Sequence, residues 1–292
     1  MNILTFDIEE WYIEKAFRGG RASKYKQFDE AFNRVIDLLA EHGIRATFFC
    51  VGQLAVEFPD IVKRVVAEGH EVGCHSNVHT WVDKMDEKGF RNDTLNALKA
   101  LEDVSGKKVN SYRAPAFSIT PNNKWAVEVL AECGIENDAS IFPTCRDFGG
   151  YKGFPQDTPC IIEHNGLSLK EYPVCLTTVL GKAVAFSGGG YFRILPYWKV
   201  SRTIKNRDYN IFYFHLADLI TEKRTMMSKT EYEEYFMEPG TIKNRVMRYI
   251  KSNVGKGDAF VRLKMLLNES RFVCIQEADS MVCWDSVKTI IL

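Results

Sequence analysis

Two histidines four residues apart, His75 and His79, are the residues of this chain whose types and spacing best suit metal chemistry. They lie in a Gly-Cys-His-Ser-Asn-Val-His segment that follows a short apolar run. Neutral imidazole nitrogens at this spacing can meet one divalent cation, either from one helix face or from a tight loop after a strand. The alternative interpretation is a pair of loop histidines that hydrogen-bond to the backbone.

Two carboxylates near the start of the chain, Asp7 and Glu9, flank Ile8. On a continuing strand both carboxylates would point to one face, while Ile8 would pack on the other. A pair placed in this way can divide proton transfer and metal binding between its members. The alternative is a helix start, because Glu10 and residues 11–13 follow and acidic residues suit a helix N-terminus.

Three further polar residues, Arg113, Asp138 and His215, stand at the ends of apolar runs. A guanidinium in the turn Arg113-Ala-Pro could orient a carboxylate through a bidentate contact, although a surface arginine is the alternative. Burial would lower the pKa of the His215 imidazole and a neighbouring acid would raise it, and either environment suits a general acid. A buried histidine bonded to the backbone is the alternative at that position.

The elements that must position these residues follow a βα rhythm. Short apolar runs alternate with amphipathic stretches, which is typical of a parallel sheet covered by helices. Polar residues at successive strand ends indicate a (β/α) barrel with its site on one face. We expect strands at 3–6, 45–52, 71–74, 109–112, 135–138, 167–174 and 209–214, helices at 28–42, 59–68, 93–104, 123–133, 242–250 and 260–267, and a loop at 187–191.

The composition narrows the class of protein. The chain has 292 residues with 46% hydrophobic content, enough for a large core, and 38 basic residues balance 38 acidic ones, which argues against a nucleic-acid partner. Eight cysteines, at positions 50, 74, 133, 145, 160, 175, 274 and 283, form no CxxC pair and are expected to be reduced and mostly buried. With no leader-like or membrane-spanning apolar run, we expect a cytoplasmic protein.

Five motifs in order resemble those of the NodB-type polysaccharide deacetylases, over residues 3 to about 218. They are Thr5-Phe6-Asp7, His75-Ser76-Asn77-Val78-His79, Arg113-Ala114-Pro115-Ala116-Phe117, Asp138-Ala139-Ser140 and Phe214-His215. The opening segment 7–10 and the Gly-Gly-Gly-Tyr-Phe-Arg element within 188–198 resemble more closely the subgroup associated with exopolysaccharide synthesis loci.

The resemblance implies a distorted (β/α) barrel over residues 1–220, in a single domain with a C-terminal helical extension, 221–292, packed on it. It implies metal-assisted hydrolysis of an N-acetyl group on a carbohydrate, with zinc as the expected cation. The implied roles are catalytic base for Asp7, metal ligands for His75 and His79, orientation of the base for Arg113, general acid for His215, and support of the far side of the site for Asp138.

One position departs from the family pattern. Ile8 follows Asp7, where the family typically has adjacent aspartates. Glu9 is the candidate third ligand because it shares a face with Asp7, but its longer side chain could instead fill the metal position and leave the site metal-free. Two other functions therefore stay open: hydrolysis of another linear or cyclic amide without metal, and a catalytically silent carbohydrate-binding barrel. The oligomeric state of the protein is open too.

Aromatic residues could stack against sugar faces around such a site if they are exposed, although core packing is the more common role. They are Trp11, Tyr12, Phe117, Tyr191, Phe192, Tyr197 and Trp198.

Overall fold

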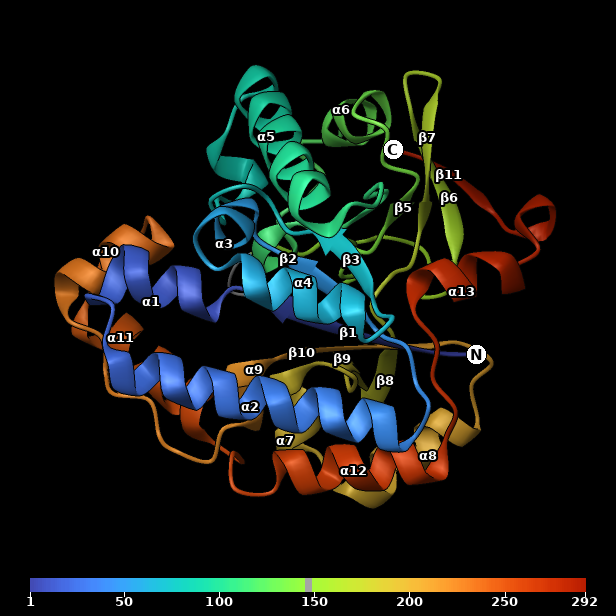
Figure 1. The fold of residues 1–292 in the computed structure, drawn as a ribbon. Helices are drawn as coiled ribbons and strands as arrows, with labels where there is room; N and C mark the ends of the chain where they lie inside the picture. The colour runs from blue at the N-terminus through green and yellow to red at the C-terminus, as the bar shows by residue number, and fades with distance from the viewer. Residues whose placement is uncertain (145–148) are drawn as a thin grey trace.

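Nine strands form one sheet in the computed structural model of this protein, which describes residues 1–144 and 149–292. The strand order is β10-β1-β2-β3-β4-β5-β7-β6-β11, and helices lie on both sides of the sheet (Figure 1). All neighbouring strands are parallel except β6 and β7. The expected α/β fold is therefore confirmed. The strands are β1 (Asn2–Ile8), β2 (Thr47–Cys50), β3 (Glu71–Cys74), β4 (Ser111–Tyr112), β5 (Asn137–Asp138), β6 (Cys160–His164), β7 (Leu167–Glu171), β10 (Asn210–His215) and β11 (Thr289–Ile291), beside a separate hairpin of β8 (Leu176–Val179) and β9 (Lys182–Ala185).

Within the described residues, no strand ladder closes the sheet into a barrel. The described part of the sheet ends at β10 on one side and at β11 on the other. Beyond β7, however, the chain returns to β10: Tyr209 Oη donates a hydrogen bond to the Pro173 carbonyl at 2.9 Å, and the Ile211 N–H donates to Cys175 Sγ at 3.2 Å. The sheet is thus an open, distorted version of the barrel that the sequence led us to expect.

The helices of the first half follow the predicted ranges with shifted ends. Helix α5 begins earlier than expected because Asp86 caps it, accepting a hydrogen bond from the Gly89 N–H at 2.7 Å. The predicted helices are α2 (Ala22–Glu41), α4 (Pro59–Ala67), α5 (Glu87–Ser105) and α6 (Ala126–Glu132). Helix α1 (Glu10–Arg18) corresponds to the helix start that the sequence left as an alternative. The helices without a sequence prediction are α3 (Gly52–Glu57), α8 (Tyr197–Lys205), α9 (Leu216–Leu219), α10 (Lys229–Phe236), α13 (Ile275–Met281) and the 3-10 turns Val82–Lys84, Pro115–Phe117 and Trp284–Ser286.

The expectation of a loop at residues 187–191 is wrong in its second half, where helix α7 (Gly189–Ile194) begins. Glycines suggested a loop, but here they allow close packing. A Cβ atom added to Gly189 would lie 1.9 Å from Asp218 Oδ2, so the helix can start against that carboxylate only because the side chain is absent.

The carboxyl ends of five strands meet at one edge of the sheet. Strand β1 lies between β10 and β2, with Asp7 opposite both His215 and Phe49. The next pairings align Cys50 with Cys74 and Cys74 with Tyr112. Because the strands are parallel and in register, the residues that follow them emerge side by side. This alignment brings the predicted site residues of the first half together with His215.

The C-terminal part of the chain packs into the same core as the central sheet. The Val273 N–H donates to the Asn2 carbonyl and the Leu4 N–H donates to the Val273 carbonyl, so this segment pairs with β1. Strand β11 pairs with β6, and α10 lies beside α1 (Figure 1). The domain boundary at residue 220 stays a prediction. The helices of this part are α10 (Lys229–Phe236), α11 (Ile242–Asn253), α12 (Ala259–Glu269) and α13 (Ile275–Met281).

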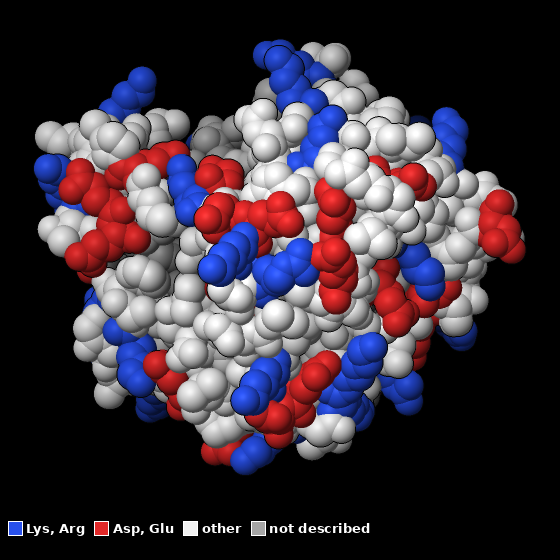
Figure 2. Space-filling model, turned by 90° about the horizontal axis from the view of Figure 1, so that it is seen from above, with Lys and Arg blue, Asp and Glu red and all other residues white. Residues whose placement is uncertain are grey.

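Three general expectations concern the surface and the thiols. Within the described ranges, all seven cysteines are free and five are buried, as expected, while Cys145 lies outside the described residues. Among the helices of those ranges, none is both long and apolar enough to cross a membrane. On the face seen in Figure 2, basic and acidic side chains are interspersed, in keeping with the zero net charge.

Candidate active site

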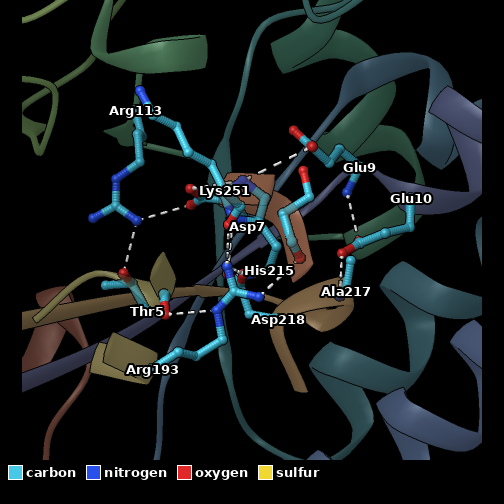
Figure 3. Close-up of polar contacts among 12 residues, drawn as sticks. Thr5, Asp7, Glu9, Glu10, Arg113, Arg193, His215, Ala217, Asp218 and Lys251 are labelled. Atoms are coloured by element: carbon cyan, nitrogen blue, oxygen red, sulfur yellow. Dashed lines mark hydrogen bonds and ion pairs between the residues drawn. The ribbon is translucent and has the colours of Figure 1, made fainter. Parts of the chain in front are cut away.

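Arg113 and Asp7 form a buried ion pair at the centre of the sheet edge. Arg113 Nη1 donates to Asp7 Oδ1 at 2.8 Å and to Thr5 Oγ1 at 2.7 Å (Figure 3). Arg113 Nε donates to the Ala139 carbonyl at 3.1 Å. The bidentate contact predicted from the sequence is wrong, because Nε is committed to Ala139 and one nitrogen alone reaches the carboxylate. The guanidinium also lies over the ring of Phe49, 4.3 Å from its centroid.

This arrangement keeps Asp7 ionised. Burial alone would raise the pKa of Asp7, but Arg113, His75 and His215 together lower it below its ordinary value. A buried carboxylate that remains charged near neutral pH can accept a proton from a reactant. Asp7 therefore has the environment that its predicted role as base requires.

Glu9, His75 and His79 converge on one point, with one ligand atom of each within 4.8 Å of the others. His75 Nε2 lies 3.7 Å and His79 Nε2 lies 2.6 Å from Glu9 Oε2. Glu9 Oε2 is nevertheless buried without a hydrogen bond of acceptable geometry in the described structure. Such an orphaned oxygen beside two imidazoles is the donor set expected around a divalent cation.

The tautomer of His75 follows from its neighbour. His75 Nδ1 lies 2.7 Å from the backbone carbonyl oxygen of Arg113, which can only accept a hydrogen bond. Nδ1 therefore carries the proton, and Nε2 keeps the lone pair that a metal ligand needs. This carbonyl contact is the usual outer support of a metal-binding histidine.

The two histidines lie on a tight loop after β3, one of the two arrangements that the sequence allowed. Ser76 and His79 both have left-handed backbone conformations, with φ of 65° and 59°. The Asp93 carboxylate holds the loop by accepting a hydrogen bond from the Asn77 N–H at 2.9 Å. The ring of Tyr235 stacks on His79, with centroids 5.8 Å apart and an interplanar angle of 8°.

Glu9 follows the end of β1 and is the N-cap residue of α1, so the helix-start interpretation and the metal-ligand interpretation are compatible. Glu10 takes the first turn of α1 and accepts a hydrogen bond from the Ala217 N–H at 2.8 Å. Burial alone would raise the pKa of Glu9, but His79 and His215 lower it well below its ordinary value. Glu9 is thus a charged candidate ligand, while Ile8 is buried in the core.

His215 faces both carboxylates from β10. Its Nε2 lies 3.9 Å from Asp7 Oδ2 and 3.8 Å from Glu9 Oε1, and its Nδ1 lies 3.3 Å from Asp218 Oδ2. Burial alone would lower the pKa of His215, but Glu9, Asp218 and Asp7 raise it to about 10. A protonated imidazole fits the predicted role of general acid. With 31% of its side chain exposed, His215 also marks the side from which solvent reaches the site.

Asp138 lies behind Arg113 instead of beside the metal cluster. Its carboxyl accepts a hydrogen bond from Ser140 Oγ, which in turn accepts one from the Ala114 N–H. The Glu171 carboxyl lies against Asp138, and burial raises the pKa of Asp138 to about 6. The position suits the supporting role implied by the resemblance.

Several residues of the site were not identified from the sequence. Asp218 accepts a hydrogen bond from the His215 N–H, and Arg193 Nη2 lies 3.5 Å from Asp218 Oδ1 (Figure 3). Asp218 follows a strand-end histidine by three residues and Arg193 belongs to the Gly-Gly-Gly-Tyr-Phe-Arg element, so both had a sequence signal. Tyr235, with Oη 3.5 Å from Glu9 Oε1, and Glu171 had none.

Most of the candidate sugar-stacking aromatics serve the core. Trp11, Phe117 and Phe192 are buried, whereas Trp198 is 66% exposed on α8. Core packing is therefore the role of the first three.

Residues 3–137 match the sequence profile of the polysaccharide deacetylase family, and residues 139–279 match that of a domain of unknown function (DUF3473). Residues 3–137 are therefore similar to the polysaccharide deacetylase family that the motifs predicted. The narrower subgroup associated with exopolysaccharide loci stays a prediction.

The sequence relatives cover this same region. A peptidoglycan-N-acetylglucosamine deacetylase of Bacillus cereus is 36% identical over 96 residues, which are 32% of this chain and 35% of that protein. A chitooligosaccharide deacetylase of Bradyrhizobium is 30% identical over 117 residues, which are 38% of this chain and 51% of that protein. The matches thus span about a third to a half of the length of these relatives.

Among solved structures, a Mycobacterium smegmatis protein ascribed to the polysaccharide deacetylases has the same fold. Its TM-score is 0.64 at 17% identity, and the match covers 100% of this chain and 92% of that one. The likeness extends through the C-terminal half.

Proposed function

We propose that this protein is a metal-dependent hydrolase that removes N-acetyl groups from an amino-sugar polysaccharide or its precursor. The observation that carries the proposal is the convergence, at one sheet edge, of the Arg113–Asp7 pair and His215 on the cluster of Glu9, His75 and His79. The similarity of residues 3–137 to the polysaccharide deacetylase family and the deacetylase activity named for the two sequence relatives support it.

Glu9, His75 and His79 would hold the cation, and zinc suits two imidazoles and one carboxylate. The donor chemistry fits, because Glu9 Oε2 lacks a hydrogen bond and the His75 tautomer leaves Nε2 free to ligate. A bound divalent cation supplies Lewis-acid polarisation of the acetyl carbonyl and of the attacking water. The orphaned oxygen favours Glu9 as a ligand over Glu9 as a replacement for the metal.

The chain's own residues move the protons. Asp7, kept ionised and fixed by Arg113, takes a proton from the attacking water. His215, protonated beside Asp218, donates a proton to the departing amine nitrogen. Arg113 does not contact the substrate in this scheme and acts as a positioning residue.

The test is acetate release from N-acetylated chitooligosaccharides by the zinc-loaded protein. Asp7→Asn is expected to lower kcat about 10²- to 10⁴-fold, because the general base is lost. The matched control is Asp60→Asn on the exposed surface of α4, which should leave the rate unchanged. Acetate release unaltered by Asp7→Asn would contradict the mechanism.

Ile8 is buried and stands where the family usually has an aspartate, so the experiment must also distinguish two other functions. Turnover of linear or cyclic amides in place of acetylated sugars would identify a different amide hydrolase. Sugar binding by calorimetry without turnover, in every divalent metal tried, would identify a silent binding barrel.

We also propose that the protein acts in the cytoplasm and contributes to exopolysaccharide synthesis. The free cysteines of the described residues support the first part. The element at 188–198, whose Arg193 contacts the Asp218 that bonds His215, supports the second.

A further inference from the structure

A cavity of about 90 Å³, partly open to solvent, adjoins the candidate metal cluster. It lies between α1, α10 and α11 and is bordered by the segment 220–225, elements that Figure 1 shows side by side. Glu9 and Tyr235 belong to its lining, so the cavity reaches the residues that would hold the cation. A group bound in it would therefore lie next to the reaction.

Basic side chains dominate the lining. They are Arg18, Arg21, Lys24, Lys223, Arg224, Arg245, Arg248 and Lys256, against the carboxylates of Glu9, Glu10, Glu14 and Glu222. On the face shown in Figure 2, basic and acidic side chains are interspersed. The excess of basic side chains in the cavity is therefore not a property of that whole surface.

The carboxylates of the lining already have partners. Glu14 accepts hydrogen bonds from Arg21 Nε at 2.6 Å and from Arg21 Nη2 at 2.9 Å. Glu222 Oε2 lies 3.8 Å from Lys24 Nζ. Glu9 belongs to the metal cluster and Glu10 bonds the backbone of Ala217. Four carboxylates thus face eight basic groups in the lining, and two of the four are paired with Arg21 and Lys24.

Several cations lack an anionic partner in the described structure. The Nε atoms of Arg18 and Arg245 are buried without any hydrogen-bond partner there. Lys256 is 4% exposed and donates only to the Glu222 carbonyl, at 2.8 Å. Burial, Arg224 and Arg193 lower the pKa of Lys256 to about 7, which reflects an accumulation of like charge. Buried donors without acceptors cost free energy that a bound anion would recover.

Helical spacing aims these groups at one another. Glu10, Glu14 and Arg18 follow one face of α1 at intervals of four residues, and all three line the cavity. Arg245 and Arg248 stand three residues apart on α11 and line it from the opposite side. The lining of the cavity therefore contains guanidinium groups from two helices.

We propose that this cavity binds a phosphate or diphosphate group carried by the acetylated sugar, so that the substrate is a phosphorylated amino-sugar. This inference rests on the proposed function. The charge balance favours a multiply charged phosphate over a single carboxylate, and guanidinium groups match phosphate oxygens in a fork geometry.

The direct test is titration calorimetry of the full-length, zinc-loaded protein with inorganic phosphate and pyrophosphate. Arg18→Gln and Arg245→Gln are each expected to weaken pyrophosphate binding about tenfold, because each removes a charged hydrogen-bond donor. Arg202→Gln, an exposed position on α8 outside the cavity, is the matched control and should bind as the unaltered protein does. Pyrophosphate should also raise the Tm of the unaltered protein more than that of the two cavity variants.

Two further arms separate the possible outcomes. His75→Ala should keep pyrophosphate binding, whereas binding lost in His75→Ala and kept in both arginine variants would place the anion on the metal and overturn the proposal. Glucuronate bound more tightly than pyrophosphate would replace phosphate with a carboxylate and also overturn it.

A kinetic experiment tests whether the cavity contributes to substrate binding in the reaction. Arg245→Gln should raise KM for N-acetylglucosamine 1-phosphate about tenfold and leave KM for neutral chitooligosaccharides unchanged. Pyrophosphate binding without any acetate release would uphold the cavity and contradict the proposed function. Acetate release from neutral sugars without pyrophosphate binding would uphold the proposed function and contradict the phosphate site in the cavity.

Discussion

At the scale of single residues, metal binding depends on where Glu9 places one oxygen. Glu9 Oε2 lies 2.6 Å from His79 Nε2 and forms no proper hydrogen bond. Two imidazole nitrogens and a carboxylate oxygen this close together form a donor set that suits a divalent cation. The contact therefore favours a three-residue ligand set in which Glu9 takes the role left open by Ile8.

The ligand set predicts the effect of removing each member. His79→Ala and Glu9→Gln should each lower zinc affinity at least about tenfold, because one of three protein ligands is lost. The measurement is metal content by mass spectrometry after purification without chelator. His164→Ala is the matched control, since His164 also contacts a glutamate, Glu128, but lies outside the cluster. Full zinc occupancy in Glu9→Gln would show that Glu9 is not a ligand.

The Asp138–Glu171 pair predicts how stability changes with pH. Burial raises the pKa of Asp138 to about 6 and that of Glu171 well above its ordinary value, although Arg113 opposes both shifts. The unfolded values lie near 4, so the folded protein binds more protons than the unfolded chain between about pH 4 and the folded values. The contribution to the free energy of unfolding is complete below about pH 4 and is lost as the pH rises through about 6.

Chemical denaturation between pH 4 and 8 checks this sign. The unaltered protein should lose stability relative to Asp138→Asn across that window, by roughly 1–3 kcal/mol. The ionisable groups facing Asp138 are Glu171, Arg113 and Tyr112. Because Asp138 contributes to the raised pKa of Glu171, the variant removes that contribution as well. Parallel stability curves for the two proteins would rule out a contribution from this pair.

At the scale of elements, the start of α7 holds the group that orients His215. Gly189 lets the helix begin against Asp218, and Arg193 on the same helix reaches Asp218 from one turn further along. Asp218 then contacts both the N–H and Nδ1 of His215. A short helix that begins within three consecutive glycines therefore acts on His215, the proposed general acid, through one carboxylate.

Gly189→Ala is expected to displace Asp218, because the new Cβ would lie 1.9 Å from Oδ2. Overpacking of this kind costs about 1–3 kcal/mol of stability, and kcat should fall with it as His215 loses its partner. Gly190→Ala is the matched control, since its Cβ would meet only Arg193 Nη2, at 3.9 Å. Thermal unfolding and acetate release measure both effects. Equal behaviour of the two variants would show that Asp218 can shift without cost.

At the scale of the whole molecule, the C-terminal extension is part of the core. Leu263, Leu266, Phe272 and Ile275 are buried in the same hydrophobic cluster as β1 and β10. The segment around Val273 exchanges backbone hydrogen bonds with β1. The extension also contributes Tyr235, which contacts Glu9, and most of the residues that line the basic cavity.

A chain ending at residue 220 is therefore expected not to fold cooperatively. It would expose the apolar surface that these side chains cover, and each fully buried side chain of this size contributes roughly 1.5–3 kcal/mol. Circular dichroism during thermal unfolding, with the full-length chain as the control, measures this. A cooperative transition in the shortened chain would establish residues 1–220 as an independent domain.

The sequence by itself determined the local structure and the members of the site. Hydrophobic periodicity predicted the βα units, and polar residues at strand ends predicted that Asp7, His75, Arg113 and His215 would share one edge, because parallel strands in register place their ends together. Such patterns depend on neighbours within one turn or one strand, so they can be read along the chain.

Only the tertiary structure decided which atoms meet. Tyr235 reaches Glu9 from 226 residues away, Arg113 divides its nitrogens among Thr5, Asp7 and Ala139, and α7 starts where glycines suggested a loop. These contacts arise from the packing of elements distant in sequence, where side-chain shape and competition for hydrogen bonds select one partner among several. The local periodicity of the sequence therefore does not indicate which partner a side chain contacts.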